Sequence, residues 1–246
     1  MSIIKEFNDI AKNLSNHYVD HWKQEGKKVI GFTCSYIPEE IISAAGILPF
    51  RMRGVGATST SIADIYYGPV NCSFPKCILQ LVGEGKYNFL DGAVLMPGCD
   101  SMRRIDEGWR KAAEDSNGSF PAYHCFFGVP HKVTTYGLKW FTTETRNLAT
   151  SLEKHFGVQI TKSALKNAIR QYNESRDLLM KLDEFRCQET VPISGADVTA
   201  VIIASGAMPR KEYNDLLEKL LDELKHSASA IKGKKRLLIG GSLNDD

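Results

Sequence analysis

Three of the six cysteines stand at positions where an α/β protein could gather reactive side chains. Cys34 and Cys99 each follow a short apolar run that predicts a buried strand, and Cys72 lies at or next to the start of a predicted helix. Parallel strands end at one edge of a sheet, where open α/β sheets bind ligands, so we expect all three to face that edge. Helix N-termini also stabilise thiolates, and thiolates gathered in this way could hold an iron–sulfur cluster or zinc.

Sequence spacing alone leaves a packing role open for each of these cysteines. The three positions lie far apart in the chain, unlike the closely spaced ligands of ferredoxins and zinc fingers. Cys77 follows Cys72 on the same predicted helix but points to a different side of it, so we interpret Cys77 as a core residue. Cys125 lies inside an apolar strand and Cys187 at a helix end, and both are interpreted as packing residues.

Charged side chains close to these cysteines are further candidates. Glu39 and Glu40 come directly after Pro38 at a predicted helix start, where carboxylates favour the positive end of the helix. An acid–base role for them is the alternative. Arg103 and Arg104 could hold an acidic ligand or partner, or could simply face solvent.

Other catalytic signals are poor. His17 and His21 have a spacing that suits a metal on one helix face, but no third ligand accompanies them, and a solvated face is the simpler interpretation. The chain has no G-x-S-x-G, Walker A or G-x-G-x-x-G motif. A serine hydrolase, a P-loop ATPase and a standard dinucleotide-binding fold are therefore not supported.

Alternating strands and helices must position these side chains. Strands are predicted at 29–33, 89–96 and 123–129. Helices are predicted at 4–24, 38–46, 73–84 and 102–113. This alternation predicts an α/β fold with a parallel, Rossmann-like sheet.

The pattern changes along the chain, which predicts three regions. Residues 1–133 form the α/β domain with the candidate cysteines, and residues 134–231 form a helical segment. Its helices are expected at 134–156, 161–187 and 209–227. Residues 232–246 are predicted to form the first strand of a second α/β domain, and we expect the rest of that domain to be truncated.

The amino-acid composition excludes several classes of protein. The 246 residues include 43% hydrophobic and 24% charged side chains, which is typical of a globular protein and not of a disordered one. The net charge of +2 gives no general attraction to nucleic acid or to a membrane surface. Without a long apolar run or a signal peptide, we expect a cytoplasmic protein whose cysteines stay reduced.

Three segments together resemble a known superfamily. They are GFTCSYIPEEIISAAGILPFRMRG, NCSFPKCILQLVGEG and DGAVLMPGCDSMRRIDEGW. The chain resembles the 2-hydroxyacyl-CoA dehydratase and benzoyl-CoA reductase superfamily, in order, over about residues 25–245. The combination of C-S-Y-x-P-E-E-I-I-x-A-A-G with C-D-S-M-R-R carries the resemblance.

The resemblance implies a specific chemistry. Family subunits have two related α/β domains, pair with a homologous second subunit, and each bind a [4Fe-4S] cluster through three cysteines. A separate ATP-hydrolysing iron–sulfur activator supplies one electron. In the dehydratases this makes a ketyl radical of an (R)-2-hydroxyacyl-CoA, which then loses water by syn-type elimination. In the reductases the electrons enter an aromatic thioester.

Carried over by motif, Cys72 and Cys99 are the expected cluster ligands. The family's third ligand is expected in the C-terminal domain, and Cys34 is the alternative. Glu40, or Glu39, matches an acidic position near the substrate and is the expected proton-handling group. The main expectation is a dehydratase subunit, with a benzoyl-CoA reductase subunit as the close runner-up. Two further hypotheses are a truncated non-catalytic homologue and a double-cubane-cluster reductase.

Overall fold

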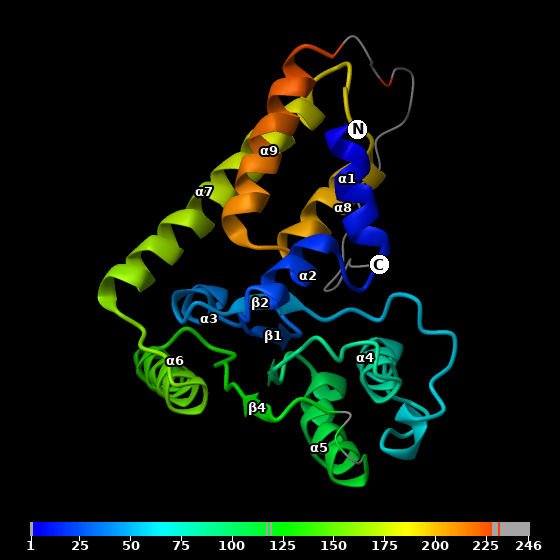
Figure 1. The fold of residues 1–246 in the computed structure, drawn as a ribbon, viewed down its shortest axis with the longest axis vertical. Coiled ribbons are helices and arrows are strands. Elements are labelled where there is room, and N and C mark those ends of the chain that lie inside the picture. The colour runs from blue at the N-terminus through cyan, green and yellow to red at the C-terminus, as the bar shows by residue number, and fades with distance from the viewer. Residues whose placement is uncertain (1, 117, 119, 228–230, 232–246) are drawn as a thin grey trace. The chain divides into compact units, whose positions relative to one another are not determined.

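The computed structural model describes residues 2–116, 118, 120–227 and 231 (Figure 1). Contacts within these residues form two compact units. One is Asp20–Ala168, and the other comprises the described residues of Met1–Val19 and Ile169–Asp246. The strand expected at 232–246 lies outside the described residues.

A four-stranded parallel sheet forms the centre of the Asp20–Ala168 unit. Its strands are β1 (Val29–Phe32), β2 (Leu48–Arg51), β3 (Gly92–Leu95) and β4 (Tyr123–Phe126), in the spatial order β2-β1-β3-β4. Every residue of the two central strands, β1 and β3, is buried. The mixed α/β fold with a parallel sheet is therefore confirmed.

Helices cover both faces of this sheet. They are α3 (Glu39–Ala44), α4 (Ser73–Gly83), α5 (Asp100–Asp115) and α6 (Thr135–Phe156), with a short 3₁₀ helix, η1 (Ala63–Ile65). Figure 1 shows α3 and α6 on one side of the sheet and α4 and α5 on the other. This arrangement follows from the strand order, because right-handed crossovers that run in opposite directions from β1 must use opposite faces.

One hydrophobic cluster of the core lies between the sheet and the helices α3 and α6. Alternate residues of β1 and β3 point into it, as expected for side chains that alternate between the faces of a strand. Helix α3 contributes Ile41 and Ile42, and α6 contributes Leu148 and Leu152. The strand side chains of this cluster are Ile30, Phe32, Val94 and Tyr123.

Strand β2 is absent from the sequence prediction. Its four residues include Pro49, which normally argues against a strand because proline has no backbone N–H for the ladder. Among the described residues, β2 is an edge strand that pairs with β1 alone, with Ile30 opposite Pro49. An edge strand tolerates proline because one of its sides needs no partner.

The single helix predicted at 4–24 is wrong. Two helices occupy this stretch, α1 (Ile3–Lys12) and α2 (His17–Gln24). The Oδ1 of Asn16 accepts the backbone N–H groups of Tyr18 and Val19, at 3.0 and 3.3 Å. Asparagine side chains compete with helical hydrogen bonds in this way, so the apolar periodicity continues while the helix is interrupted.

The second unit is helical. Besides α1 it contains α8 (Gly195–Ser205), α9 (Arg210–Lys225) and the greater part of α7 (Lys162–Cys187). Phe7 of α1 packs edge-to-face on Tyr213 of α9, with ring centroids 6.0 Å apart. The Ser175 hydroxyl on α7 contacts Oδ1 of Asn214 at 2.5 Å, which joins α7 to α9 through a buried polar contact. The helices predicted at 161–187 and 209–227 are confirmed as α7 and α9. Helix α8 was not predicted from the sequence.

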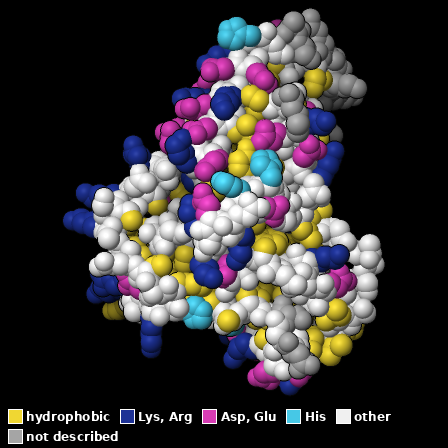
Figure 2. Space-filling model, in the orientation of Figure 1, with side chains coloured by type: hydrophobic (Ala, Val, Ile, Leu, Met, Phe, Trp, Pro, Cys, Tyr) yellow, Lys and Arg dark blue, Asp and Glu magenta, His cyan; other side chains and the backbone are white. Residues whose placement is uncertain are grey.

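Charged side chains of both signs are visible on the face drawn in Figure 2. Among the described residues, no helix combines the length and apolar composition needed to cross a membrane.

Asp91, which directly precedes β3, is hydrogen-bonded to the first residue of β1. Its Oδ2 accepts hydrogen bonds from the Lys23 ammonium at 2.6 Å and from the Val29 N–H at 2.9 Å, and its Oδ1 accepts one from Lys28 at 3.1 Å. Burial alone would raise the pKa of Asp91, but the hydrogen bonds from Lys23, Val29 and Lys28 together lower it below its usual value.

Replacing this carboxylate with an amide, Asp91→Asn, tests the anchor. A carboxyl with a lowered pKa stabilises the fold above its unfolded-state pKa of about 3.9, and this stabilisation is lost as pH falls through the folded-state pKa. We expect the variant to lose about 2 kcal/mol of unfolding free energy near neutral pH. The loss should shrink strongly below about pH 3. Urea unfolding at both pH values measures it.

Asp222→Asn is the matched control, because Asp222 pairs with Lys225 on the surface of α9 at 2.7 Å. A fully exposed pair of this kind is screened by solvent and contributes little to stability. An Asp91→Asn variant as stable as the control variant near neutral pH would contradict the anchoring role.

Candidate functional site

The strand order reverses between β1 and β3, and two of the candidate cysteines follow these strands. Cys34 lies two residues beyond β1, and Cys99 is the N-cap of α5, after β3. A Cβ placed on Gly98 would lie 3.8 Å from the Sγ of Cys34. The Cys34 thiol therefore lies against the loop that carries Cys99, at the sheet edge where α/β proteins form their ligand crevices.

Cys72 and Cys99 have equivalent local positions. Cys72 is the N-cap of α4 and Cys99 is the N-cap of α5, and both residues are exposed. Neither makes the side-chain capping hydrogen bond that Ser, Thr, Asp or Asn makes at a helix start. Both thiols thus lie at the positive ends of helices, where thiolates and bound anions are favoured.

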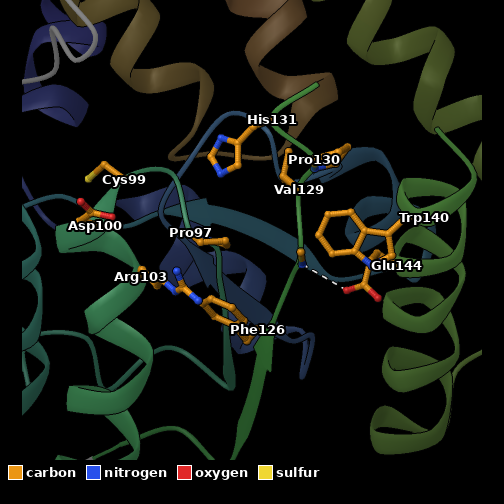
Figure 3. A pocket seen from close by; sticks show the side chains of 11 residues that line it. Pro97, Cys99, Asp100, Arg103, Phe126, Val129, Pro130, His131, Trp140 and Glu144 are labelled. Carbon is orange, nitrogen blue, oxygen red and sulfur yellow. Dashed lines mark hydrogen bonds between the residues drawn. The ribbon is translucent and has the colours of Figure 1, made fainter. Parts of the chain in front are cut away.

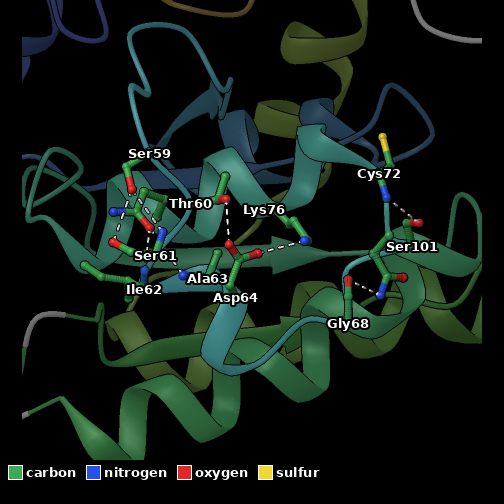
Figure 4. Close-up of polar contacts among 12 residues, drawn as sticks. Ser59, Thr60, Ser61, Ile62, Ala63, Asp64, Gly68, Cys72, Lys76 and Ser101 are labelled. Atoms are coloured by element: carbon green, nitrogen blue, oxygen red, sulfur yellow. Dashed lines mark hydrogen bonds and ion pairs between the residues drawn. The ribbon is translucent and has the colours of Figure 1, made fainter.

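Ser101 connects the two cysteine segments. The backbone N–H of Cys72 donates to Oγ of Ser101 at 3.2 Å (Figure 4). The hydroxyl of Tyr67 donates to the backbone carbonyl of Ser101, also at 3.2 Å. Burial raises the pKa of Tyr67, and the negative charge that Cys99 or Cys72 would carry as a thiolate raises it further. Tyr67 and Ser101 thus place Cys72 and Cys99 in one neighbourhood.

The segment before Cys72 is tied to α4. The ammonium of Lys76, whose side chain is buried, pairs with Oδ1 of Asp64 at 2.7 Å (Figure 4). The hydrogen bond from Lys76 lowers the pKa of Asp64. One turn further along α4, Oε1 of Gln80 accepts the N–H groups of Ile62 and Ala63. These contacts hold the chain that leads to Cys72 against the helix that Cys72 begins.

Cys34 has a different environment from the other two. It is half-buried and packs against the core between β1, α3 and α6. Its carbonyl accepts the N–H of Ile37 at 3.1 Å in a tight turn, which is followed by Glu39 and Glu40 in the first turn of α3. Both glutamates are half-buried and take part in polar interactions.

Two of the remaining three cysteines, Cys77 and Cys125, have environments that fit packing. A Cβ on Gly54 would lie 2.7 Å from the Cβ of Cys77, so this cysteine fills the space beside a bare backbone. Burial raises the pKa of Cys77 and of Cys125. Cys187, the last residue of α7, is exposed, so its interpretation as a packing residue is wrong.

Within the described residues, no three His, Cys, Asp or Glu side chains form a group that could by themselves hold a metal ion. The assignment of Cys72, Cys99 and Cys34 as ligands, and of Glu40 and Glu39 as proton-handling groups, stays a prediction.

A pocket of about 440 Å³ lies beside Cys99. Figure 3 shows Cys99, Asp100 and Arg103 of α5 on one side and Trp140 and Glu144 of α6 on the other, with the loop after β4 between them. Glu144 accepts the N–H of the buried Gly128 at 3.2 Å. The pocket opens at the same edge of the sheet as the cysteines.

Sequence reasoning missed several of these side chains. Ser101 and Tyr67 act through backbone atoms of distant segments, which no local motif reveals. His131, in the loop after β4, and Trp140, on α6, line the pocket together from separate segments. One usable signal was the Gly-Val-Pro-His run after the predicted strand at 123–129, because it ends at the same sheet edge.

A sequence model described as the D-component of 2-hydroxyglutaryl-CoA dehydratase matches residues 34–246. The chain belongs to this family. The match includes all three candidate cysteines and the pocket, so the superfamily resemblance is confirmed.

Individual members of the family share about a quarter to a third of their residues with the chain. It is 30% identical to a benzoyl-CoA reductase subunit of Thauera aromatica, over 90% of this chain and 57% of that protein. It is 25% identical to lactoyl-CoA dehydratase subunit beta of Anaerotignum propionicum, over 98% of this chain and 63% of that protein. It is 27% identical to (R)-2-hydroxyglutaryl-CoA dehydratase subunit beta of Acidaminococcus fermentans, over 95% of this chain and 59% of that protein. The chain thus spans about three fifths of the length of these dehydratase and reductase subunits.

Removing the Ser101 hydroxyl tests whether it holds Cys72 beside Cys99. In Ser101→Ala the Cys72 N–H loses its acceptor, which corresponds to about 1 kcal/mol of local stability. We expect amide hydrogen exchange over residues 68–76 to become about fivefold faster. Ser116→Ala, which removes a hydroxyl at the other end of α5, is the control. Unchanged exchange in Ser101→Ala would contradict the connection.

Proposed function

We propose that this chain is the part of a 2-hydroxyacyl-CoA dehydratase subunit that carries cluster ligands. The observation that supports the proposal most is the placement of Cys72 and Cys99 as exposed N-caps of neighbouring helices, linked through Ser101. Membership of the dehydratase family adds the chemical context.

The two exposed thiols, Cys72 and Cys99, suit an anionic iron–sulfur cluster chemically, and further ligands would have to complete the site. Both thiols are accessible, and both stand where helix N-termini favour negative charge. Cys72 and Cys99 would hold the cluster, with Cys34 as the candidate third ligand. When bound, such a cluster supplies single electrons at low potential to an acyl-CoA thioester.

The chain's own residues would position and protect the site. Tyr67 and Ser101 fix the separation of the two cysteine segments, and the burial of Tyr67 keeps water away from one side. Glu40 or Glu39 would take or return a proton at the substrate, because the turn after Cys34 delivers α3 to this edge of the sheet. A homologous second subunit and an ATP-dependent activator are the proposed partners.

Reconstitution of the purified chain with iron and sulfide under anaerobic conditions tests the ligand assignment. We expect about four irons per chain and visible absorbance. Cys72→Ser and Cys99→Ser should each remove most of both, because serine is a poor substitute for a thiolate ligand. Cys187→Ser, in the helical unit, is the matched control and should load like the parent chain.

An iron-free chain after reconstitution would contradict the proposal and favour a non-catalytic homologue. Full loading of the Cys72→Ser and Cys99→Ser variants would instead contradict the assignment of these two ligands.

A benzoyl-CoA reductase subunit is the second candidate function. It is favoured by the 30% identity to a subunit of that enzyme in Thauera aromatica. Assays of the loaded chain with a partner subunit and an activator distinguish the two reactions by mass spectrometry. We expect a 2-hydroxyacyl-CoA to lose water, whereas a reductase would add hydrogen to the ring of an aromatic thioester.

A further inference from the structure

A largely buried polar contact joins α5 to β4. Tyr123 packs into the hydrophobic cluster beneath α3 and α6, so the next residue of β4, His124, points to the opposite face of the sheet, where α5 lies (Figure 1). There Nε2 of His124 lies 3.0 Å from Oδ1 of Asp106. The His124 side chain is 20% exposed and that of Asp106 11%, so a titratable ring and a carboxylate meet with little access to water.

Asp106 also contacts a cation on its own helix. Its Oδ2 lies 2.7 Å from the guanidinium of Arg110, one turn further along α5. The two oxygens of one carboxylate therefore contact a helix residue and a strand residue. Arg110 already compensates the negative charge that would otherwise attract a proton to His124.

Aromatic packing holds the imidazole ring in place. Trp109, which is almost fully buried, lies nearly parallel to the His124 ring, with ring centroids 6.3 Å apart and an angle of 14° between the planes. Phe120 packs edge-to-face on Trp109, with centroids 5.1 Å apart. Because protein interiors are close-packed, a His124 ring that turned toward water would disturb the packing of α5 on the sheet.

The surroundings of His124 favour its neutral form. Burial has the largest effect and lowers the pKa of His124, the Asp106 carboxylate raises it, and the Arg110 guanidinium lowers it again, so that it remains below its usual value. The neighbours in the sheet add no charge: Ala93 pairs with His124 on β3, and burial raises the pKa of the adjacent Cys125 thiol. Proton uptake would therefore place a second positive charge close to Arg110, in a site with little solvent.

We propose that the contact between Asp106 and His124 is a proton-sensitive latch between α5 and β4. In neutral solution the latch holds α5, the helix that Cys99 begins, against the sheet. In mildly acidic solution, proton uptake by His124 loosens it. Asp106 lies about two turns along α5 from Cys99, and the latch needs no bound cluster.

The direction of the pH dependence follows from the preference for the neutral ring. In a locally opened chain His124 takes up a proton near the usual histidine pKa of about 6.5, whereas in the closed state it does so only at lower pH. The open state then binds more protons. The stabilisation is complete above about pH 6.5 and is lost as pH falls through the folded-state pKa.

Amide hydrogen exchange of α5 in the complete chain tests the latch, at pH values about one unit above and about one unit below 6.5. After correction for intrinsic exchange, we expect the protection of α5 to fall by about three- to tenfold at the lower pH, ten being the largest factor that one histidine contributes there. His124→Gln, whose side chain does not titrate, should remove this fall. His21→Gln is the matched control, since His21 is an exposed histidine of the same unit that pairs with Glu25 at 3.5 Å, and it should retain the fall.

NMR titration of the His124 ring tests the role of Arg110 directly. Arg110→Gln removes the positive charge close to the ring and should shift the His124 midpoint to higher pH. Lys111→Gln is the matched control, because Lys111 is the next residue of α5 and pairs instead with Asp115 at 3.0 Å. It should leave the midpoint unchanged.

Three results would overturn the proposal. They are a His124 midpoint at or above about pH 6.5, an equal fall of α5 protection in His124→Gln and in the parent chain, or equal midpoint shifts in Arg110→Gln and Lys111→Gln. A low midpoint, a fall that His124→Gln abolishes and an upward shift confined to Arg110→Gln would together support it.

Discussion

The position of β1 between β2 and β3 constrains the whole Asp20–Ala168 unit. From β1 the chain first moves outward to β2 through α3, and then returns past β1 to β3 through α4. Right-handed crossovers in opposite directions require opposite faces of the sheet, so the helices separate at this point. The carboxyl ends of β1 and β3 are then left uncovered side by side. Cys34 and Cys99 follow these two ends, and the pocket opens next to them.

Around this opening, the structure distinguishes cysteines of two kinds. Cys72 and Cys99 are exposed and each begins a helix. Cys77 and Cys125 lie in surroundings where burial raises the thiol pKa, and such thiols stay protonated. Cys34 lies between these groups, half-buried against the core but touching the loop of Cys99. The environment of each cysteine thus determines whether it is suited to chemistry or to packing.

Local sequence patterns predicted the parts of the fold that depend on local physics. The buried strands β1 and β3, the helix start at Cys72 and the helix end at Gly157, whose φ of 66° suits glycine, follow from apolar runs and terminal residues. Strand β2 was missed because only its edge position makes Pro49 acceptable. The break between α1 and α2 was missed because apolar periodicity continues through it.

Some residues of the candidate site could likewise be predicted from the sequence, and others could not. Its cysteines could be found because they sit at ends of elements, which sequence reveals. Ser101 and Trp140 could not, since the role of each depends on a contact with a segment remote in sequence: Cys72 for one, and the end of β4 for the other. The side chains that arrange a site are therefore harder to predict from sequence than those that would carry its chemistry.

The uncapped starts of α4 and α5 have a consequence for assembly. With cysteine at both N-caps, no oxygen of the capping residue satisfies the first-turn N–H groups, and each helix begins with an incomplete terminus. An anionic group held there would complete both termini at once. Its binding free energy would then add to the folding free energy through thermodynamic linkage. Binding at this site and the stability of this corner of the protein would thus be coupled.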